Sequence, residues 1–144
     1  DQGAINLLTA WITQDLPTRE SFAEWQIAEF GSPLPPRAAP DGDPDGDGLT
    51  NRMEYLIGGH PELPTPPSVL KIQSLEDTLR FDFSLPPNRS MVIETSDTLL
   101  PGSWRTWEVE GNSPIFPASG GPRTLEFQRS GASGQFFRGR VAAP

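Results

Sequence analysis

Apolar residues recur at helical spacing in three short stretches of the first sixty residues. The first stretch begins at Ile5 and is ended by Pro17, because proline cannot continue a helix. Before the second, Ser21 and Glu24 have the spacing of a capping box, and after the third comes Gly58, a residue suited to ending a helix. The pattern therefore predicts three short helices. Their stripes consist of Ile5, Leu8, Trp11 and Ile12, of Phe22, Trp25 and Phe30, and of Met53, Leu56 and Ile57.

The period of the pattern changes to two after the prolines at 61–67. Residues 79–85 alternate apolar and polar without a fault, which predicts a strand with Phe81, Phe83 and Leu85 on one buried face. Turn-forming residues separate this segment from others of the same kind. The strand-like segments are 69–74, 79–85, 91–96, 104–109, 124–128 and 136–141. So many short strands predict a small antiparallel sandwich.

These patterns predict an α+β fold, with short N-terminal helices and an acidic loop packed on a small antiparallel β-sandwich. Three parts follow one another along the chain: a helix in residues 1–17, a helical segment with the acidic loop in 18–66, and the sandwich in 67–144. The stretch 31–40 is rich in proline and has no periodicity, so we expect a stiff extended spacer there.

Composition narrows the classes of function. The chain has 11 Lys and Arg against 19 Asp and Glu, a net charge of -8, which argues against nucleic-acid and anionic-membrane partners. The absence of cysteine excludes disulfides, thiol catalysis and zinc sites of the Cys type. No apolar run has the length of a membrane span. We expect a soluble monomer that is part of a longer polypeptide.

The acidic loop is the one motif with clear chemistry. Residues 41–54 hold five carboxylates and one Arg, and Ca²⁺ prefers six to eight oxygen ligands from such a loop. A loop starting at Asp41 would place Arg52 at position 12, where a bidentate acid is needed. Starting at Asp43 fills every position of the EF-hand pattern. The predicted ligands are Asp43, Asp45, Asp47, the carbonyl of Leu49, Asn51 directly or through water, and Glu54.

The loop departs from paired EF-hands. Position 8 is Thr50 rather than an apolar residue, and the segment before position 1 is rich in proline instead of helical. It looks like the single aspartate-rich loops of thrombospondin type 3 repeats and, more distantly, dockerins, which would bring a duplicated loop. Two other interpretations are a solvated acidic linker and a Mg²⁺ site, although Mg²⁺ prefers fewer protein ligands.

The motifs together resemble a C-terminal module of large secreted bacterial proteins. The resemblance covers residues 20–144 and is carried by Phe22–Trp25, Asp43–Gly58 with Pro61, Ile93–Ser96 followed by Trp104, and Phe136–Val141. It implies a calcium loop with a trailing helix, followed by a β-sandwich. His60 stands where that group usually has Asp. Residues 1–17 resemble the closing helix of an upstream cytochrome- or sugar-dehydrogenase-like domain.

Other residues have chemistry to weigh. His60 is the one histidine of the chain and lies in a predicted turn, where we expect it to be solvent-exposed. Three strand carboxylates, Asp82, Glu94 and Glu126, are expected on a solvated face rather than as a catalytic pair. Trp104 and Trp107 are three apart on one predicted strand and so point to opposite faces, which leaves one of them as a candidate platform for a sugar.

We therefore expect a non-enzymatic, calcium-stabilised accessory module of an exported bacterial protein, secreted or located at the cell surface or in the periplasm. Its calcium would be structural and would fix the proline-rich connection, and its partners would be the upstream domains of the same polypeptide. Two alternatives are a carbohydrate-binding module of a secreted enzyme and a sorting or surface-attachment domain.

Overall fold

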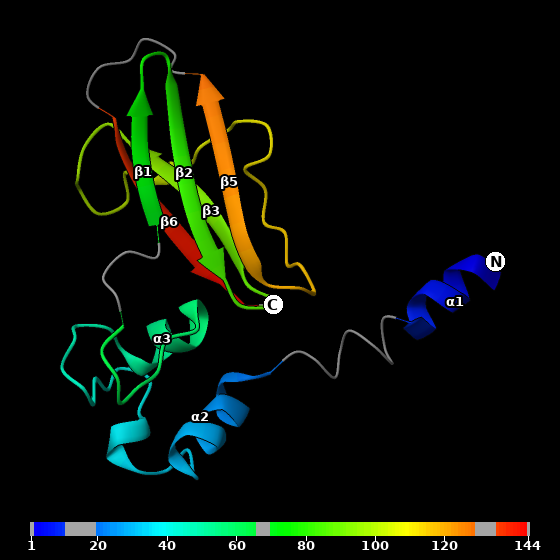
Figure 1. Cartoon of the computed structure of the whole chain (residues 1–144), viewed down its shortest axis with the longest axis vertical. Helices are drawn as coiled ribbons and strands as arrows, with labels where there is room; N and C mark the ends of the chain where they lie inside the picture. The colour runs from blue at the N-terminus through cyan, green and yellow to red at the C-terminus, as the bar shows by residue number, and fades with distance from the viewer. Residues whose placement is uncertain (1, 11–19, 66–69, 129–134, 144) are drawn as a thin grey trace. The chain divides into compact units, whose positions relative to one another are not determined.

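The computed structural model describes residues 2–10, 20–65, 70–128 and 135–143. The chain forms two compact units, Asp1–Thr65 and Pro66–Pro144. Short helices make up the first and two small antiparallel sheets the second, so the α+β fold class is confirmed (Figure 1). Residues 66–144 hold eight Lys and Arg against eight Asp and Glu, so the whole formal charge of -8 belongs to residues 1–65.

The described part of the first unit contains the three expected α-helices and one short 3-10 helix. They are α1 (Gln2–Ala10), α2 (Phe22–Phe30), η3 (Pro36–Ala38) and α3 (Asn51–Ile57). The capping box before α2 is confirmed, because Ser21 N donates to Glu24 Oε2 at 2.7 Å and Glu24 N donates to Ser21 Oγ at 3.2 Å. The part of the first stripe at Trp11 and Ile12, and Pro17 after it, lie outside the described residues.

Helices α2 and α3 are joined by a cluster of aromatic rings. Trp25 and Tyr55 are buried, and the ring of Phe22 lies 5.6 Å from that of Trp25 and 5.3 Å from that of Tyr55. The Tyr55 hydroxyl donates to the carbonyl of Glu20 at 2.7 Å, and the Arg52 guanidinium lies 5.0 Å from the centroid of the Phe22 ring. These contacts give two helices of fewer than ten residues the support that neither has alone.

The buried face of α3 differs from the expected apolar stripe. Met53 is 41% exposed, whereas Asn51, Glu54 and Tyr55 are buried. The helix still ends where the sequence indicates, at Gly58 with a left-handed φ of 78°. A polar face is buried because it meets the acidic loop and the proline-rich segment before it, and hydrophobic periodicity does not report such a contact.

The described part of the second unit is a sandwich of two three-stranded sheets, ordered β1-β2-β5 and β4-β3-β6. The strands β1, β2 and β5 lie side by side in Figure 1. All strand pairs are antiparallel, and Phe81 on β2 lies opposite Leu125 on β5. As expected, Phe81, Phe83 and Leu85 share the buried face, where they meet residues of the second sheet such as Ile93. The strands are β1 (Leu70–Leu75), β2 (Thr78–Leu85), β3 (Ser90–Ser96), β4 (Arg105–Thr106), β5 (Gly121–Gln128) and β6 (Phe136–Ala142).

The expected strand at 104–109 is much shorter than predicted. Only Arg105–Thr106 pairs as β4, because the N–H of Val109 turns back to the carbonyl of Trp107 at 3.0 Å. The side chain of Asn112 replaces the missing strand: its Oδ1 accepts from Ile93 N at 2.8 Å and its Nδ2 donates to Ile93 O at 2.8 Å. The backbone N–H of Trp107 still donates to Ile93 O at 3.0 Å, so the buried amide replaces one backbone bond of a longer β4, the one from the N–H of Ile93.

Candidate metal centre

The acidic loop is folded by its own aspartates. Asp43 accepts from the N–H groups of Gly46 at 2.9 Å and Gly48 at 3.0 Å. Asp45 Oδ1 accepts from Asp47 N at 3.1 Å. Gly46 and Gly48 have φ values of 76° and 93°, which residues with a Cβ rarely adopt. The alternation of acid and glycine therefore produces a tight loop whose carboxylates turn inward.

Three carboxylates meet inside this loop. Asp43, Asp45 and Asp47 each offer one oxygen, and these oxygens lie within 4.8 Å of one another. Two ligands of one Ca²⁺ are at most about 5 Å apart, since each bond is about 2.3–2.6 Å long. The cluster could hold a metal ion, and its all-oxygen chemistry suits a hard cation.

Glu54 on α3 is not one of the three members of this cluster, but it lies near enough for their charges to act on it. It is 0% exposed, and its Oε1 accepts from Thr65 Oγ1 at 3.3 Å. Burial raises the pKa of Glu54 to about 7, the Thr65 hydrogen bond opposes the rise, and the charges of Asp45 and Asp47 add to it. At this pKa about half of the Glu54 carboxyl groups would be protonated at pH 7, and a bound cation would favour the charged form.

Asn51 has a role that its place in the motif does not reveal. Its Nδ2 donates to the carbonyls of Arg37 and Ala39, at 2.7 Å each, while its backbone N–H donates to Gly42 O at 2.8 Å. The expected extended spacer is therefore wrong in part, because 31–40 contains η3 and is attached to α3. Gly42 must be glycine, since a Cβ there would lie 2.9 Å from Asn51 Nδ2.

Three buried oxygens of the loop lack any partner. Among the residues that the structure describes, four buried side-chain polar atoms make no hydrogen bond, and three of them are Asp45 Oδ2, Asn51 Oδ1 and Glu54 Oε2. These belong to positions 3, 9 and 12 of the loop pattern. Buried polar atoms are normally satisfied, so their concentration here indicates a missing partner that accepts oxygen ligands.

The remaining predicted positions behave differently from one another. Leu49 donates its N–H to Asp47 Oδ1 at 2.7 Å, and the ligand role of its carbonyl stays a prediction. Asp41 is exposed and does not belong to the cluster of three aspartates. The register that starts at Asp43 is therefore the one whose carboxylates gather.

Sequence reasoning missed Thr65, which contacts the site from outside the motif. Its N–H donates to Asp47 Oδ2 at 2.6 Å, and its hydroxyl donates to Glu54. Nearby Gly59 allows this approach, because a Cβ there would lie 2.7 Å from Thr65 Oγ1 and 3.1 Å from Glu54 Oε1. Thr65 lies 18 positions after Asp47, and no spacing rule in the sequence points to it.

The other candidate residues have partners of their own. His60 is exposed as expected, with Nδ1 accepting from Glu62 N at 3.1 Å and Nε2 3.6 Å from Glu29 Oε2. Asp82 and Glu126 both pair with Arg80. The expectation that Glu94 is solvated is wrong: it is 8% exposed, because two arginines of β6 cover it.

The two tryptophans do lie in different surroundings. Trp107 packs against the sandwich core, with its ring 4.7 Å from that of Phe127 and 5.0 Å from that of Phe137. Trp104 lies outside that core cluster, and the guanidinium of Arg138 sits 4.4 Å from its ring centroid. Trp104 is therefore the one that remains as a candidate platform.

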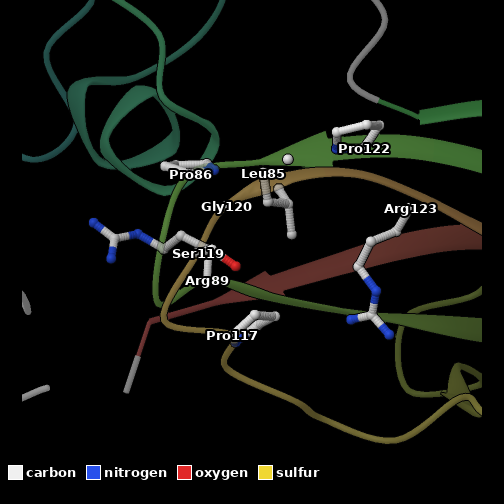
Figure 2. A pocket seen from close by; sticks show the side chains of 9 residues that line it. Leu85, Pro86, Arg89, Pro117, Ser119, Gly120, Pro122 and Arg123 are labelled. Carbon is white, nitrogen blue, oxygen red and sulfur yellow. The ribbon is translucent and has the colours of Figure 1, made fainter.

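A pocket of about 250 Å³ lies at one end of the sandwich (Figure 2). Prolines and glycines make up most of its lining, together with Leu85, Ser119 and two arginines. In Figure 2 the side chains of Arg89 and Arg123 extend in different directions, so they do not converge on one ligand. Its lining contains no carboxylate, histidine or lysine that could act as a general base.

Comparisons with known proteins add no relative. No protein-family model, curated protein or solved structure matches this chain. None of the described helices is both long and apolar enough to cross a membrane.

Proposed function

We propose that this chain is a non-catalytic, calcium-binding accessory module in which the ion stabilises the structure. The observation that carries the proposal is the set of unpartnered buried oxygens on Asp45, Asn51 and Glu54. Asp45 belongs to the cluster of three aspartates, Asn51 and Glu54 follow it in the same motif, and calcium is the common cation that accepts so many protein oxygens. Asp43, Asp47 and the carbonyl of Leu49 complete the proposed ligand set.

The contacts of the ligands support a structural role. Asn51 is tied to the proline-rich segment through Arg37 and Ala39, and Thr65 is tied to Asp47 and Glu54. An ion that holds these side chains would therefore order both proline-rich stretches that flank the loop. The ion would also remove the repulsion that the charges of the loop produce in its absence.

The wider context of the proposal rests on resemblance. The loop, its trailing helix and the sandwich are similar to C-terminal modules of large secreted bacterial proteins, so we propose an exported protein with upstream domains as partners. Carbohydrate binding and surface attachment are the alternatives. The tryptophans of the sandwich give them little support, since Trp107 is part of the core and Arg138 lies over Trp104.

Calorimetric titration of the full chain with CaCl₂ tests the proposal. We expect one site with a Kd on the order of 10⁻⁴–10⁻³ M, as in extracellular modules, and weaker binding of Mg²⁺. At tenfold excess over Kd, calcium should add about 1.4 kcal/mol to the free energy of unfolding, and a chelator should remove it.

Two variants identify the site. Glu54→Gln removes a charged ligand and should weaken calcium binding at least tenfold, whereas Asp41→Asn, in the same loop, should change it less than twofold. Equal losses in both variants would show nonspecific attraction to an acidic segment. A melting curve that 10 mM calcium leaves unchanged would refute the structural role.

A further inference from the structure

Among the described strands, β6 forms an open edge of its sheet. In the order β4-β3-β6, it pairs only with β3 within the described parts of the chain, and it is seven residues long. The edge strand β4 has two residues, and β5 carries Pro122 near its start. An open edge presents unpaired backbone N–H and C=O groups to an incoming strand, and β6 has neither proline nor lysine to prevent pairing.

The residues of β6 alternate between the core and the outer face. Phe137 and Val141 pack against the sandwich core, so Phe136, Arg138 and Arg140 occupy the opposite face. The side chains of Arg138 and Arg140 are 49% and 54% exposed. Residues two apart on a strand repeat at about 6.5–7 Å, which is the spacing of alternate residues in any strand laid beside it.

A buried carboxylate holds both arginines in place. Glu94 Oε2 accepts from Arg138 Nε at 2.8 Å, and Glu94 Oε1 accepts from Arg140 Nε at 2.8 Å. The ring of Trp104 supports the Arg138 guanidinium from one side. Two guanidiniums on one carboxylate leave a net charge of about +1 on this face of the sheet.

The charge of this edge selects its partner. A second copy of β6 paired antiparallel would bring arginines close to arginines, and like charges on neighbouring strands are unfavourable. A strand with Asp or Glu at alternate positions would place carboxylates beside Arg138 and Arg140, where opposite charges are favourable. The edge thus discourages self-association and fits an acidic extended segment.

We propose that the open edge of β6 binds an extended acidic peptide as an added antiparallel or parallel strand. Backbone hydrogen bonds would supply affinity, and Arg138 and Arg140 would supply the preference for alternate acidic residues. This site belongs to the sandwich and is independent of the metal loop, so calcium removal should not abolish it.

The probe is a capped seven-residue peptide of alternating Thr and Glu, with a matched peptide that has Lys for Glu. We expect the acidic peptide to bind the full chain at least tenfold more tightly than the basic one, with affinity falling as salt rises. Amide hydrogen exchange should show new protection in β6. This measurement needs no variant and locates the peptide directly.

Variants then test the arginines. Arg138→Gln and Arg140→Gln each leave Glu94 with one arginine partner. Each should lower the affinity for the acidic peptide at least fivefold. Arg105→Gln, on the opposite edge strand of the same sheet, should change the affinity for the acidic peptide less than twofold. Equal binding of both peptides, or no protection in β6, would overturn the proposal. Binding of polygalacturonate without protection of β6 would instead identify a glycan site and would also overturn it.

Discussion

The backbone N–H of Thr65 donates to Asp47 Oδ2 at 2.6 Å, across 18 positions of the chain. Its hydroxyl donates to Glu54, so one residue contacts two members of the proposed ligand set. The last residue of the first unit is thereby tied to the acidic loop. The contact links the loop to the chain that leaves the unit, and it can be tested with a near-isosteric change.

Replacing Thr65 by Val should lower the free energy of unfolding of the metal-free chain by about 1 kcal/mol, the usual contribution of one hydrogen bond. The variant keeps the backbone donor to Asp47 and loses only the hydroxyl that serves Glu54. Urea denaturation in the presence of a chelator measures the difference. Thr106→Val on β4 is the control, and an equal loss there would show a general effect of the substitution.

Gly48→Ala should destabilise the chain by about 1–2 kcal/mol, because Gly48 has a φ of 93° that disfavours a Cβ. The same change should weaken calcium binding several-fold, since the loop carboxylates depend on this backbone. Gly102→Ala, at a φ of 82° in the sandwich, is a matched control for the strain. It should lose similar stability and keep its calcium affinity, and a loss of affinity there would contradict a local site.

Asn112→Ala should cost about 3 kcal/mol, because it removes three hydrogen bonds and leaves the buried N–H of Ile93 without its acceptor, while Ile93 O keeps the bond from Trp107 N. Thermal or chemical unfolding measures the loss. The neighbouring exposed residue offers the control Ser113→Ala, which should stay within about 0.5 kcal/mol. A small effect of Asn112→Ala would mean that β3 does not need this side chain.

The pairing of Glu94 should make the stability depend on pH. Burial acts to raise its pKa, but hydrogen bonds and charges from Arg138 and Arg140 more than offset this and lower the pKa. The charged Glu94 therefore stabilises the fold fully above pH 4.5, the ordinary pKa of its carboxyl group. This stabilisation is lost as the pH falls through the lower pKa that Glu94 has in the folded chain.

Glu94→Gln should consequently be less stable than the original chain at pH 7, by about 2 kcal/mol, and the difference should shrink below about pH 4.5. Urea denaturation between pH 7 and pH 3 follows it. Asp97→Asn, which affects an exposed ion pair with Arg105, should change stability by less than about 0.5 kcal/mol at any pH. A Glu94→Gln difference that stays constant with pH would exclude the charge as its cause.

Local patterns in the sequence predicted part of this structure well. The buried face of Phe81, Phe83 and Leu85 follows from alternation alone, and the start of α2 follows from its capping box. The gathering of the loop carboxylates follows from a spacing that places alternate acids on the inside of a tight turn.

Contacts between distant residues were beyond such patterns. Glu94 is covered by Arg138 and Arg140, which are 44 and 46 positions away, so alternation assigned it to solvent. The strand expected at 104–109 ends early because a side chain, Asn112, takes the place of a backbone. Thr65 completes the loop through tertiary contacts that no motif encodes.

The unequal division of charge separates the two halves of the chain in their response to the medium. All of the formal charge of -8 lies in residues 1–65, and the sandwich is neutral overall. Net electrostatic repulsion therefore acts within the helical half alone, and it weakens as the ionic strength rises. Transfer into salt-free water would destabilise the helical half and leave the stability of the sandwich nearly unchanged. The salt concentration thus changes the stability of one half of the polypeptide selectively.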